Sequence, residues 1–175
     1  MAEPTTVLVT YASRMGSTQQ IAEAIGHELE TSGIRITLAP CADSISPETF
    51  DGVILGSAIY TRRWLKAAKR FLKRHAGELN PKTTWLFHSG PIGEGAREQQ
   101  VPAPKAISRV IARYGLRTPV TFGGRLDTEH ATGPLSRWMG AEGPLSGDFR
   151  DWDRIRAWAS DIAQQLHRAS AERQQ

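Results

Sequence analysis

The chain has 175 residues, a formal net charge of +4 at pH 7 and a sequence pI of about 9.6. Its hydrophobic content of 39% and charged content of 23% are those of a folded domain in water, and we expect one domain over residues 1–175 with a frayed tail over 168–175. No apolar run is long enough to cross a bilayer and the first residues lack a secretory pattern, so we expect a cytoplasmic protein without a transmembrane segment. The single cysteine, Cys41, excludes a disulfide framework and a cysteine-rich zinc site, and we expect no metal.

The first half of the chain alternates apolar runs with helical patterns. Residues 7–12 form a compact apolar run, and Ile21, Ile25 and Leu29 then recur at every fourth position, as on one face of a helix. The segment "IRITLAP" alternates apolar and polar residues, which predicts a strand near the sheet edge. The continuous apolar run "DGVILGSAIY" predicts a central strand.

The second half continues the alternation. A basic helix is predicted from Trp64 to His75, followed by the strand "TTWLFHSG", a helix around residues 107–111, the strand "TPVTFGG" and a last helix over residues 152–166. This order predicts an α/β fold in which helices cover both faces of a five-stranded parallel sheet. Two long connections rich in Gly and Pro, residues 89–104 and 123–150, follow strand ends, where open parallel sheets bind their ligands.

The turn between the first strand and the first helix reads Ser-Arg-Met-Gly-Ser-Thr over residues 13–18. The sequence has no Walker A motif, no dinucleotide fingerprint after this strand and no nucleophile elbow. Hydroxyl groups, a glycine that allows close backbone approach and the positive end of a helix suit a phosphate, and Arg14 offers further charge. An ordinary capped turn is the alternative interpretation.

The stretch "YASRMGSTQQIAEAI" resembles the phosphate loop of flavodoxins, in which residues with hydroxyl groups surround a glycine. Ser13, Gly16 and Thr18 match that pattern, and Met15 stands where the family has a hydroxyl residue. The segments "FDGVILGSAIYTRRWLKAAKRFLKRHAGEL" and "GDFRDWDRIRAWASDIAQQL" look like the flavodoxin-domain branch that includes menaquinone-dependent protoporphyrinogen oxidase. The resemblance covers most of the chain and implies a flavodoxin-like fold.

By this resemblance the cofactor is flavin mononucleotide (FMN), bound across the carboxyl ends of the strands. The residues implied at its phosphate are Ser13, Arg14, Met15, Gly16, Ser17 and Thr18. The residues implied at its ring are Ser57, Ala58, Ile59, Tyr60 and Thr61 in one loop and Ser89, Gly90, Pro91, Ile92, Gly93 and Gly95 in another. Tyr60 is the better candidate for stacking on the ring, because Trp64 also fits a core position.

Charge at the ring loop departs from that of the acidic flavodoxins that carry electrons. One positive charge about 6 Å from the ring is worth roughly 3 kcal/mol at an effective dielectric near 20, which corresponds to a potential change on the order of 100 mV. Arg62 or Arg63 would have this effect if either faced the ring, whereas solvent would screen an outward arginine. His88 ends a strand nearby and is either a proton donor or a buried structural residue. No catalytic residue is assigned.

The residues leave three functions open. The first is a two-electron oxidoreductase that uses FMN and acts on a quinone or a porphyrinogen-type substrate, with a redox protein as a further partner. The second uses a deazaflavin instead, and the third is an interaction module without a cofactor. The positive charge also leaves a peripheral membrane contact open. We expect no nucleic acid as a partner, because the aromatic residues lie mainly on predicted core positions.

Overall fold

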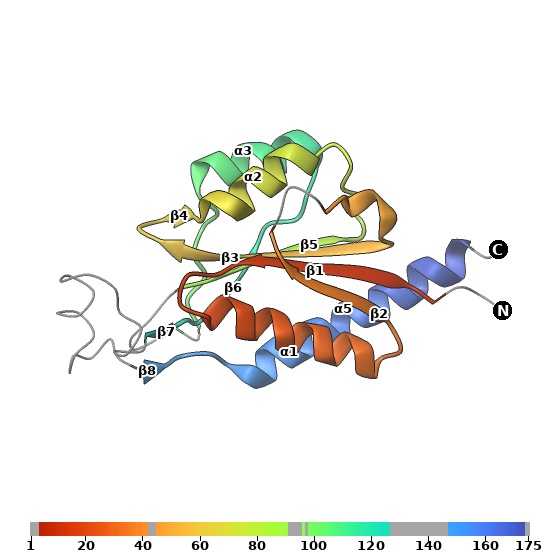
Figure 1. Ribbon diagram of the computed structural model, residues 1–175, viewed down its shortest axis with the longest axis horizontal. Helices are drawn as coiled ribbons and strands as arrows, with labels where there is room; N and C mark the ends of the chain where they lie inside the picture. Colours follow the sequence, from red (N-terminus) through yellow and green to blue (C-terminus); the bar gives the residue numbers. More distant parts are fainter. Residues whose placement is uncertain (1–3, 42–44, 91–95, 97, 127–146, 174–175) are drawn as a thin grey trace.

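A computed structural model describes residues 4–41, 45–90, 96, 98–126 and 147–173 (Figure 1). Five parallel strands form a sheet in the order β2-β1-β3-β5-β6, so the predicted α/β fold with a five-stranded parallel sheet is confirmed. The strands are β1 (Thr6–Ala12), β2 (Arg35–Pro40), β3 (Gly52–Tyr60), β5 (Thr84–Ser89) and β6 (Val120–Phe122). The described α-helices are α1 (Ser17–Thr31), α2 (Lys66–His75), α3 (Lys105–Tyr114) and α5 (Trp152–Arg173).

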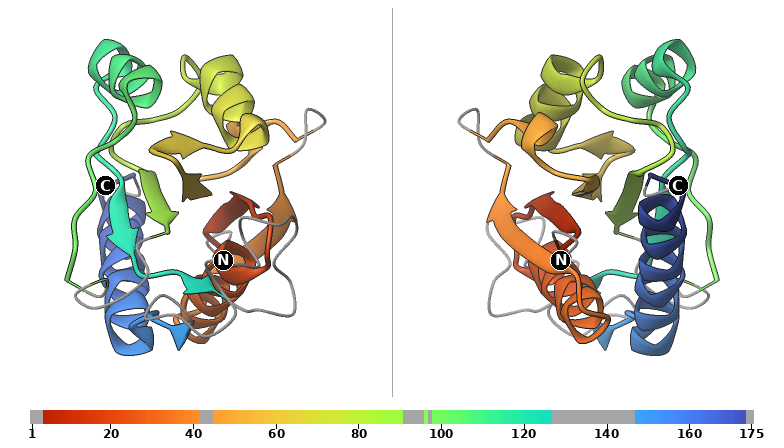
Figure 2. Two further views of the ribbon diagram at one scale, coloured as in Figure 1. Left: turned by 90° about the vertical axis from the view of Figure 1, so that its left-hand side faces the viewer. Right: turned by 90° about the vertical axis from the view of Figure 1, so that its right-hand side faces the viewer.

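The helices form one layer on each face of the sheet. Helices α1 and α5 lie on one face, and α2 and α3 lie side by side on the other (Figures 1 and 2). Alternate residues of a strand point to opposite faces, so each inner strand supplies both layers. Val7 and Val9 of β1 pack under α1 and α5, while Leu8 between them packs under α2 and α3. This two-sided burial explains why the inner strands read as continuous apolar runs.

Strand β2 lies at the edge of the sheet, as its alternating pattern predicts. It pairs only with β1, and Leu38 on it is 40% exposed. Its connection to β3 contains a short 3-10 helix, η1 (Pro47–Thr49), so no α-helix is described between these two strands. The regular alternation of strand and helix is therefore interrupted here.

The predicted helix start at Trp64 is wrong. Arg63 and Trp64 form a short strand, β4, antiparallel to the end of β3, and α2 begins only at Lys66. The backbone N–H of Leu65 donates to Ser57 Oγ at 3.1 Å, so this segment is held against β3. The apolar spacing of Trp64 matched the helix because its side chain, 5% exposed, does enter the same core.

The C-terminal helix is longer than expected. Helix α5 continues to Arg173, whereas a frayed tail was expected from residue 168. Ser170 Oγ and Thr5 Oγ1 share a hydrogen bond of 2.9 Å, which joins the last turns of α5 to the beginning of β1. This contact between distant parts of the chain provides a tertiary anchor that local sequence does not reveal.

A second, two-stranded sheet follows β6. Strand β7 (Arg125–Leu126) pairs antiparallel with β8 (Gly147–Asp148), so the two ends of one long Gly- and Pro-rich connection are joined. Most of this connection, which was identified in the sequence as residues 123–150, lies outside the described residues.

Close packing of β3 against β5 yields a stability prediction. A Cβ atom at Gly56 would overlap the ring of Phe87, which is fully buried beside it. We expect Gly56→Ala to lower the free energy of unfolding by about 1–3 kcal/mol, because the core must shift to admit the methyl group. Gly26→Ala is the matched control, since its Cβ would meet only Ile36 Cγ2 at 3.5 Å and alanine favours a helix. Urea unfolding measures both; equal destabilisation by the two would contradict the prediction.

Candidate cofactor site

Three segments meet at the carboxyl edge of the sheet. The strand register aligns Ala12 of β1 with Ser57 of β3, and Ala58 of β3 with Ser89 of β5. The turn after β1, the β3–β4 hairpin and the start of the connection after β5 therefore lie at one edge, on the left in Figure 1. This is where an open parallel sheet binds its ligands.

The turn after β1 holds two buried polar atoms without partners. Gly16 adopts a left-handed conformation, with φ of 81°, and α1 begins at Ser17. Ser13 Oγ and Ser17 Oγ are both buried and have no hydrogen-bond partner among the described residues. The first N–H groups of a helix lack acceptors within the helix, and its dipole is positive at this end. The turn therefore presents hydroxyl donors to an anion.

Thr18 lies differently from these two serines. It is fully buried, and its Oγ1 shares a hydrogen bond of 2.8 Å with Ser89 Oγ at the end of β5. The hydroxyls of Thr18 and Ser89, both expected at the cofactor, thus bind each other and join the two loops. Met15 is half-buried and Arg14 is exposed.

Arg14 links the turn to the hairpin. Its guanidinium carbon lies 6.0 Å from the centre of the Tyr60 ring. Tyr60 is 36% exposed, burial raises the pKa of its phenol, and the Arg14 charge opposes that rise. Arg14, expected at a phosphate, and Tyr60, expected at a ring, therefore lie close together.

The β3–β4 hairpin has a tight two-residue turn. Tyr60 pairs with Arg63, and Thr61 and Arg62 between them have φ of 46° and 59°. Two successive left-handed residues give the turn that matches strand twist, which usually takes Asn or Gly. Backbone conformations of this kind concentrate at functional sites. Arg62 and Arg63 are exposed, so solvent screens their charges.

A buried histidine connects the hairpin to the rest of the edge. His88 of β5 is fully buried, and its Nδ1 accepts a hydrogen bond of 3.2 Å from Trp64 Nε1–H. An indole can only donate, so the imidazole proton is on Nε2. His88 Nε2 then donates to Thr121 Oγ1 at 2.8 Å, and Val101 O lies 3.1 Å from the same nitrogen.

Burial lowers the pKa of His88 to about 4, despite the backbone carbonyl of Val101. The imidazole is neutral at pH 7, and its two nitrogens are occupied by Trp64 and Thr121. Of the two roles considered for His88, the geometry fits a structural residue that joins β4, β5 and β6. Ser57 also holds this hairpin, because its Oγ accepts the hydrogen bond from Leu65 N–H and donates one to Ala58 O at 2.9 Å.

Glycines allow three backbone segments, at Ile59, Gly90 and Gly124, to lie close together beyond the strand ends. A Cβ at Gly90 would lie 2.7 Å from Ile59 O, and a Cβ at Gly124 would lie 3.3 Å from Gly90 Cα. The loop after β5 therefore begins directly against the hairpin. Pro91, Ile92, Gly93 and Gly95, four of the expected ring residues, lie outside the described residues.

Arg150 forms an interaction that sequence reasoning missed. It is 5% exposed; its Nε donates to Asp148 Oδ1 at 2.7 Å, its Nη1 to Gln20 Oε1, and its guanidinium lies 4.4 Å from the Trp152 ring. The hydrogen bonds from Arg150 lower the pKa of Asp148. Arg150 thus fixes β8 beside the first turn of α1. The only local sign of this interaction in the sequence is the segment "DFRDW", in which charged and aromatic residues follow one another.

The sheet order and the helical layer on each face of the sheet define a flavodoxin-like α/β protein. A family model described as a flavodoxin domain matches residues 8–132, and the chain belongs to that family. Among the described residues no helix is long and apolar enough to cross a membrane, and no three potential metal ligands cluster together.

The solved structures with this fold include an archaeal flavodoxin, with a TM-score of 0.61 and 16% identity over 93% of this chain and 99% of that one. The Flv1 flavodiiron core from Synechocystis has a TM-score of 0.65 and 17% identity over 96% of this chain and 37% of that one. At such identities the likeness concerns the fold alone.

Curated relatives include the protoporphyrinogen IX dehydrogenase [quinone] of Escherichia coli strain K12. The two sequences are 28% identical over 104 residues, which are 58% of this chain and 57% of that protein. The chain is thus a distant relative of a quinone-dependent dehydrogenase and matches little more than half of its length.

The neutral state of His88 predicts a pH dependence. A pKa lowered to about 4 in the folded protein, against 6.5 when unfolded, means that the unfolded chain binds the extra proton first. Stability from this group is complete above pH 6.5 and is lost as the pH falls towards 4, by about 3 kcal/mol in total. Gln at position 88 keeps one acceptor and one donor but does not titrate. We expect His88→Gln to lose about 3 kcal/mol less than the parent over this range in urea unfolding; parallel curves would contradict the assignment.

Proposed function

We propose that the chain binds FMN at the carboxyl edge of the sheet and acts as an oxidoreductase. The observation that carries this proposal is the pair of buried hydroxyls of Ser13 and Ser17 at the start of α1, which have no hydrogen-bond partner in the described part of the chain. A buried polar group without a partner costs about 1–3 kcal/mol, and a ligand that accepts hydrogen bonds from both serines would remove this cost. Phosphate oxygens are acceptors, and both hydroxyls would donate to them.

The remaining residues of the edge fit a flat ring. FMN, when bound, supplies reversible redox chemistry, and the protein supplies position and electrostatics. Tyr60 offers a half-exposed aromatic face, and the tight hairpin that carries it is fixed by Ser57 and Trp64. Gly90 keeps the facing backbone free of a side chain. These residues would orient the ring.

The substrate class is inferred from the family relationship. The Escherichia coli relative is named as a quinone-dependent dehydrogenase of protoporphyrinogen IX, so we propose a quinone or a porphyrinogen-type molecule as the substrate of this chain. Nothing in the comparisons favours menaquinone over another quinone, or a deazaflavin over FMN. An absorbance spectrum separates the two cofactors.

The decisive experiment is a titration of the purified chain with FMN, followed by absorbance, with mass spectrometry of any small molecule that heat releases. Flavin bands at about 375 and 450 nm and saturable FMN binding would support the proposal. One band at about 420 nm with a deazaflavin mass would replace the cofactor. A chain that binds neither would leave an interaction module. Oxidation of protoporphyrinogen with a quinone acceptor then tests the activity.

Replacing either Ser13 or Ser17 is expected to weaken FMN binding without lowering the stability of the protein. We expect Ser13→Ala and Ser17→Ala each to weaken FMN binding by about tenfold, because each removes one donor to the phosphate. The same changes should leave the free energy of unfolding without FMN unchanged or raised, since no hydrogen bond within the described protein is lost.

Thr84→Val is the matched control. Thr84 Oγ1 is also buried and has no partner within the described ranges, but Thr84 is the first residue of β5 and so lies at the amino end of the strand, away from the candidate site. This change should leave FMN affinity unchanged. Equal affinity for FMN in the parent and both serine variants would exclude this turn as the phosphate site.

A further inference from the structure

Charge is divided between the two helical layers. Helices α2 and α3 carry eight Lys or Arg residues and no Asp or Glu. Helix α1, across the sheet, carries three Glu and no Lys or Arg, and α5 carries four Arg against three acidic residues. The net charge of +4 is therefore unevenly distributed, and the face covered by α2 and α3 is strongly basic.

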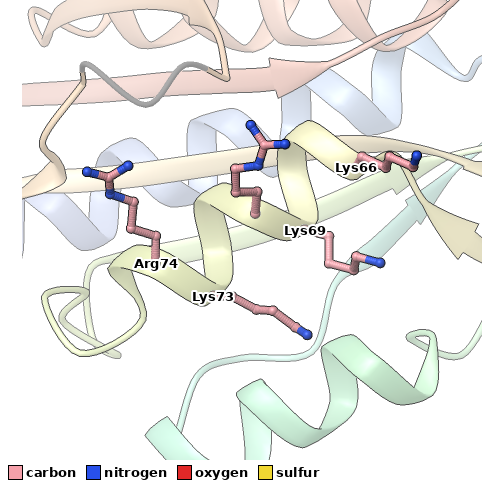
Figure 3. Close-up of a pocket in the computed structure, with 5 residues that line it drawn as sticks. Lys66, Lys69, Lys73 and Arg74 are labelled. Carbon is pink, nitrogen blue, oxygen red and sulfur yellow. The ribbon is translucent and has the colours of Figure 1, made fainter.

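The cations of α2 lie around a shallow groove. The apolar side of this helix, including Phe71 and Leu72, is buried against the sheet, which turns the charged side outward. Five cations line a groove of about 520 Å³: Lys66, Lys69, Arg70, Lys73 and Arg74. Figure 3 shows Lys73 extending towards α3 and Arg74 on the other side of the helix. Lys105, Arg109 and Arg113 of α3 are exposed on the neighbouring helix.

This basic layer, defined as the eight cations of α2 and α3, borders the candidate cofactor site. Lys66 is the first residue of α2, and it follows the hairpin that carries exposed Tyr60, Arg62 and Arg63. Figure 1 shows β4 and the beginning of α2 at the same edge of the molecule. A partner seated on the basic layer would thus lie beside the place where the cofactor is proposed.

We propose that the basic layer docks an acidic redox protein. The proposal rests on the proposed function, because it assigns the partner of that same site. Opposite charge steers association and suits the small, short-lived contacts of electron-transfer proteins. A helix that binds a bilayer buries an apolar face in it, and α2 has already buried its own in the core. Of the large apolar side chains exposed in the described structure, only Tyr114 belongs to these two helices.

The test measures binding of a small acidic ferredoxin with one two-iron, two-sulfur cluster, by calorimetry, at about 10 and about 200 mM NaCl. The double variant Lys66→Glu/Lys73→Glu reverses two exposed charges of the basic layer. The matched control Arg156→Glu/Arg168→Glu makes the same change in net charge on exposed positions of α5. Each protein is measured with and without FMN, so a failure of cofactor binding does not affect the result. Circular dichroism checks that both variants fold.

We expect at least about tenfold weaker ferredoxin binding at the higher salt and in the α2 variant, and less than about twofold weakening in the α5 control. Equal weakening by both variants would overturn the proposal, because net charge alone would then explain binding. No ferredoxin binding would overturn it too. If vesicles with about 30% phosphatidylglycerol then bind instead, and the α2 variant abolishes that binding, the layer meets a membrane.

Discussion

The hydrogen bond from the Trp64 indole to His88 Nδ1 is the contact on which the geometry at the carboxyl edge of the sheet depends. It ties a short strand outside the parallel sheet to the buried end of β5. Because an indole only donates, this bond fixes the imidazole proton on Nε2. His88 Nε2–H then donates a hydrogen bond to Thr121 Oγ1 of β6. The hairpin that presents Tyr60 is therefore held by a neutral group that burial keeps uncharged.

The hydroxyl groups at this edge divide into two kinds. Ser57, Thr18 and Ser89 are engaged within the protein and hold its loops together. Ser13 and Ser17 have no such partner among the residues that the structure describes, and burying their hydroxyls costs stability. Proteins commonly sacrifice some stability where a ligand is to be bound. Under the proposed function, Ser13 and Ser17 supply the hydroxyls that a ligand would accept from, whereas those of Thr18 and Ser89 are used within the fold.

Sequence alone predicted most of the architecture, because the inner strands are buried on both faces and read as unbroken apolar runs. It also found the turn at residues 13–18, where a glycine and several hydroxyls stand together. The sequence did not reveal the β3–β4 hairpin, because its turn residues, Thr61 and Arg62, are not the Asn or Gly that such a turn usually contains. The hydrogen bonds between Thr18 and Ser89 and from Arg150 to Gln20 were equally hidden, because these partners lie 71 and 130 residues away in the chain.

The antiparallel pair of β7 and β8 has a consequence for how this fold varies. It closes the two ends of a long connection, and Arg150 secures that closure against α1. Extending a closed loop costs little, about 0.6 kcal/mol for each doubling of its length. Because β7 and β8 hold the two ends of this connection together, insertions or deletions between Leu126 and Gly147 would leave the five-stranded sheet and its carboxyl edge in the same arrangement.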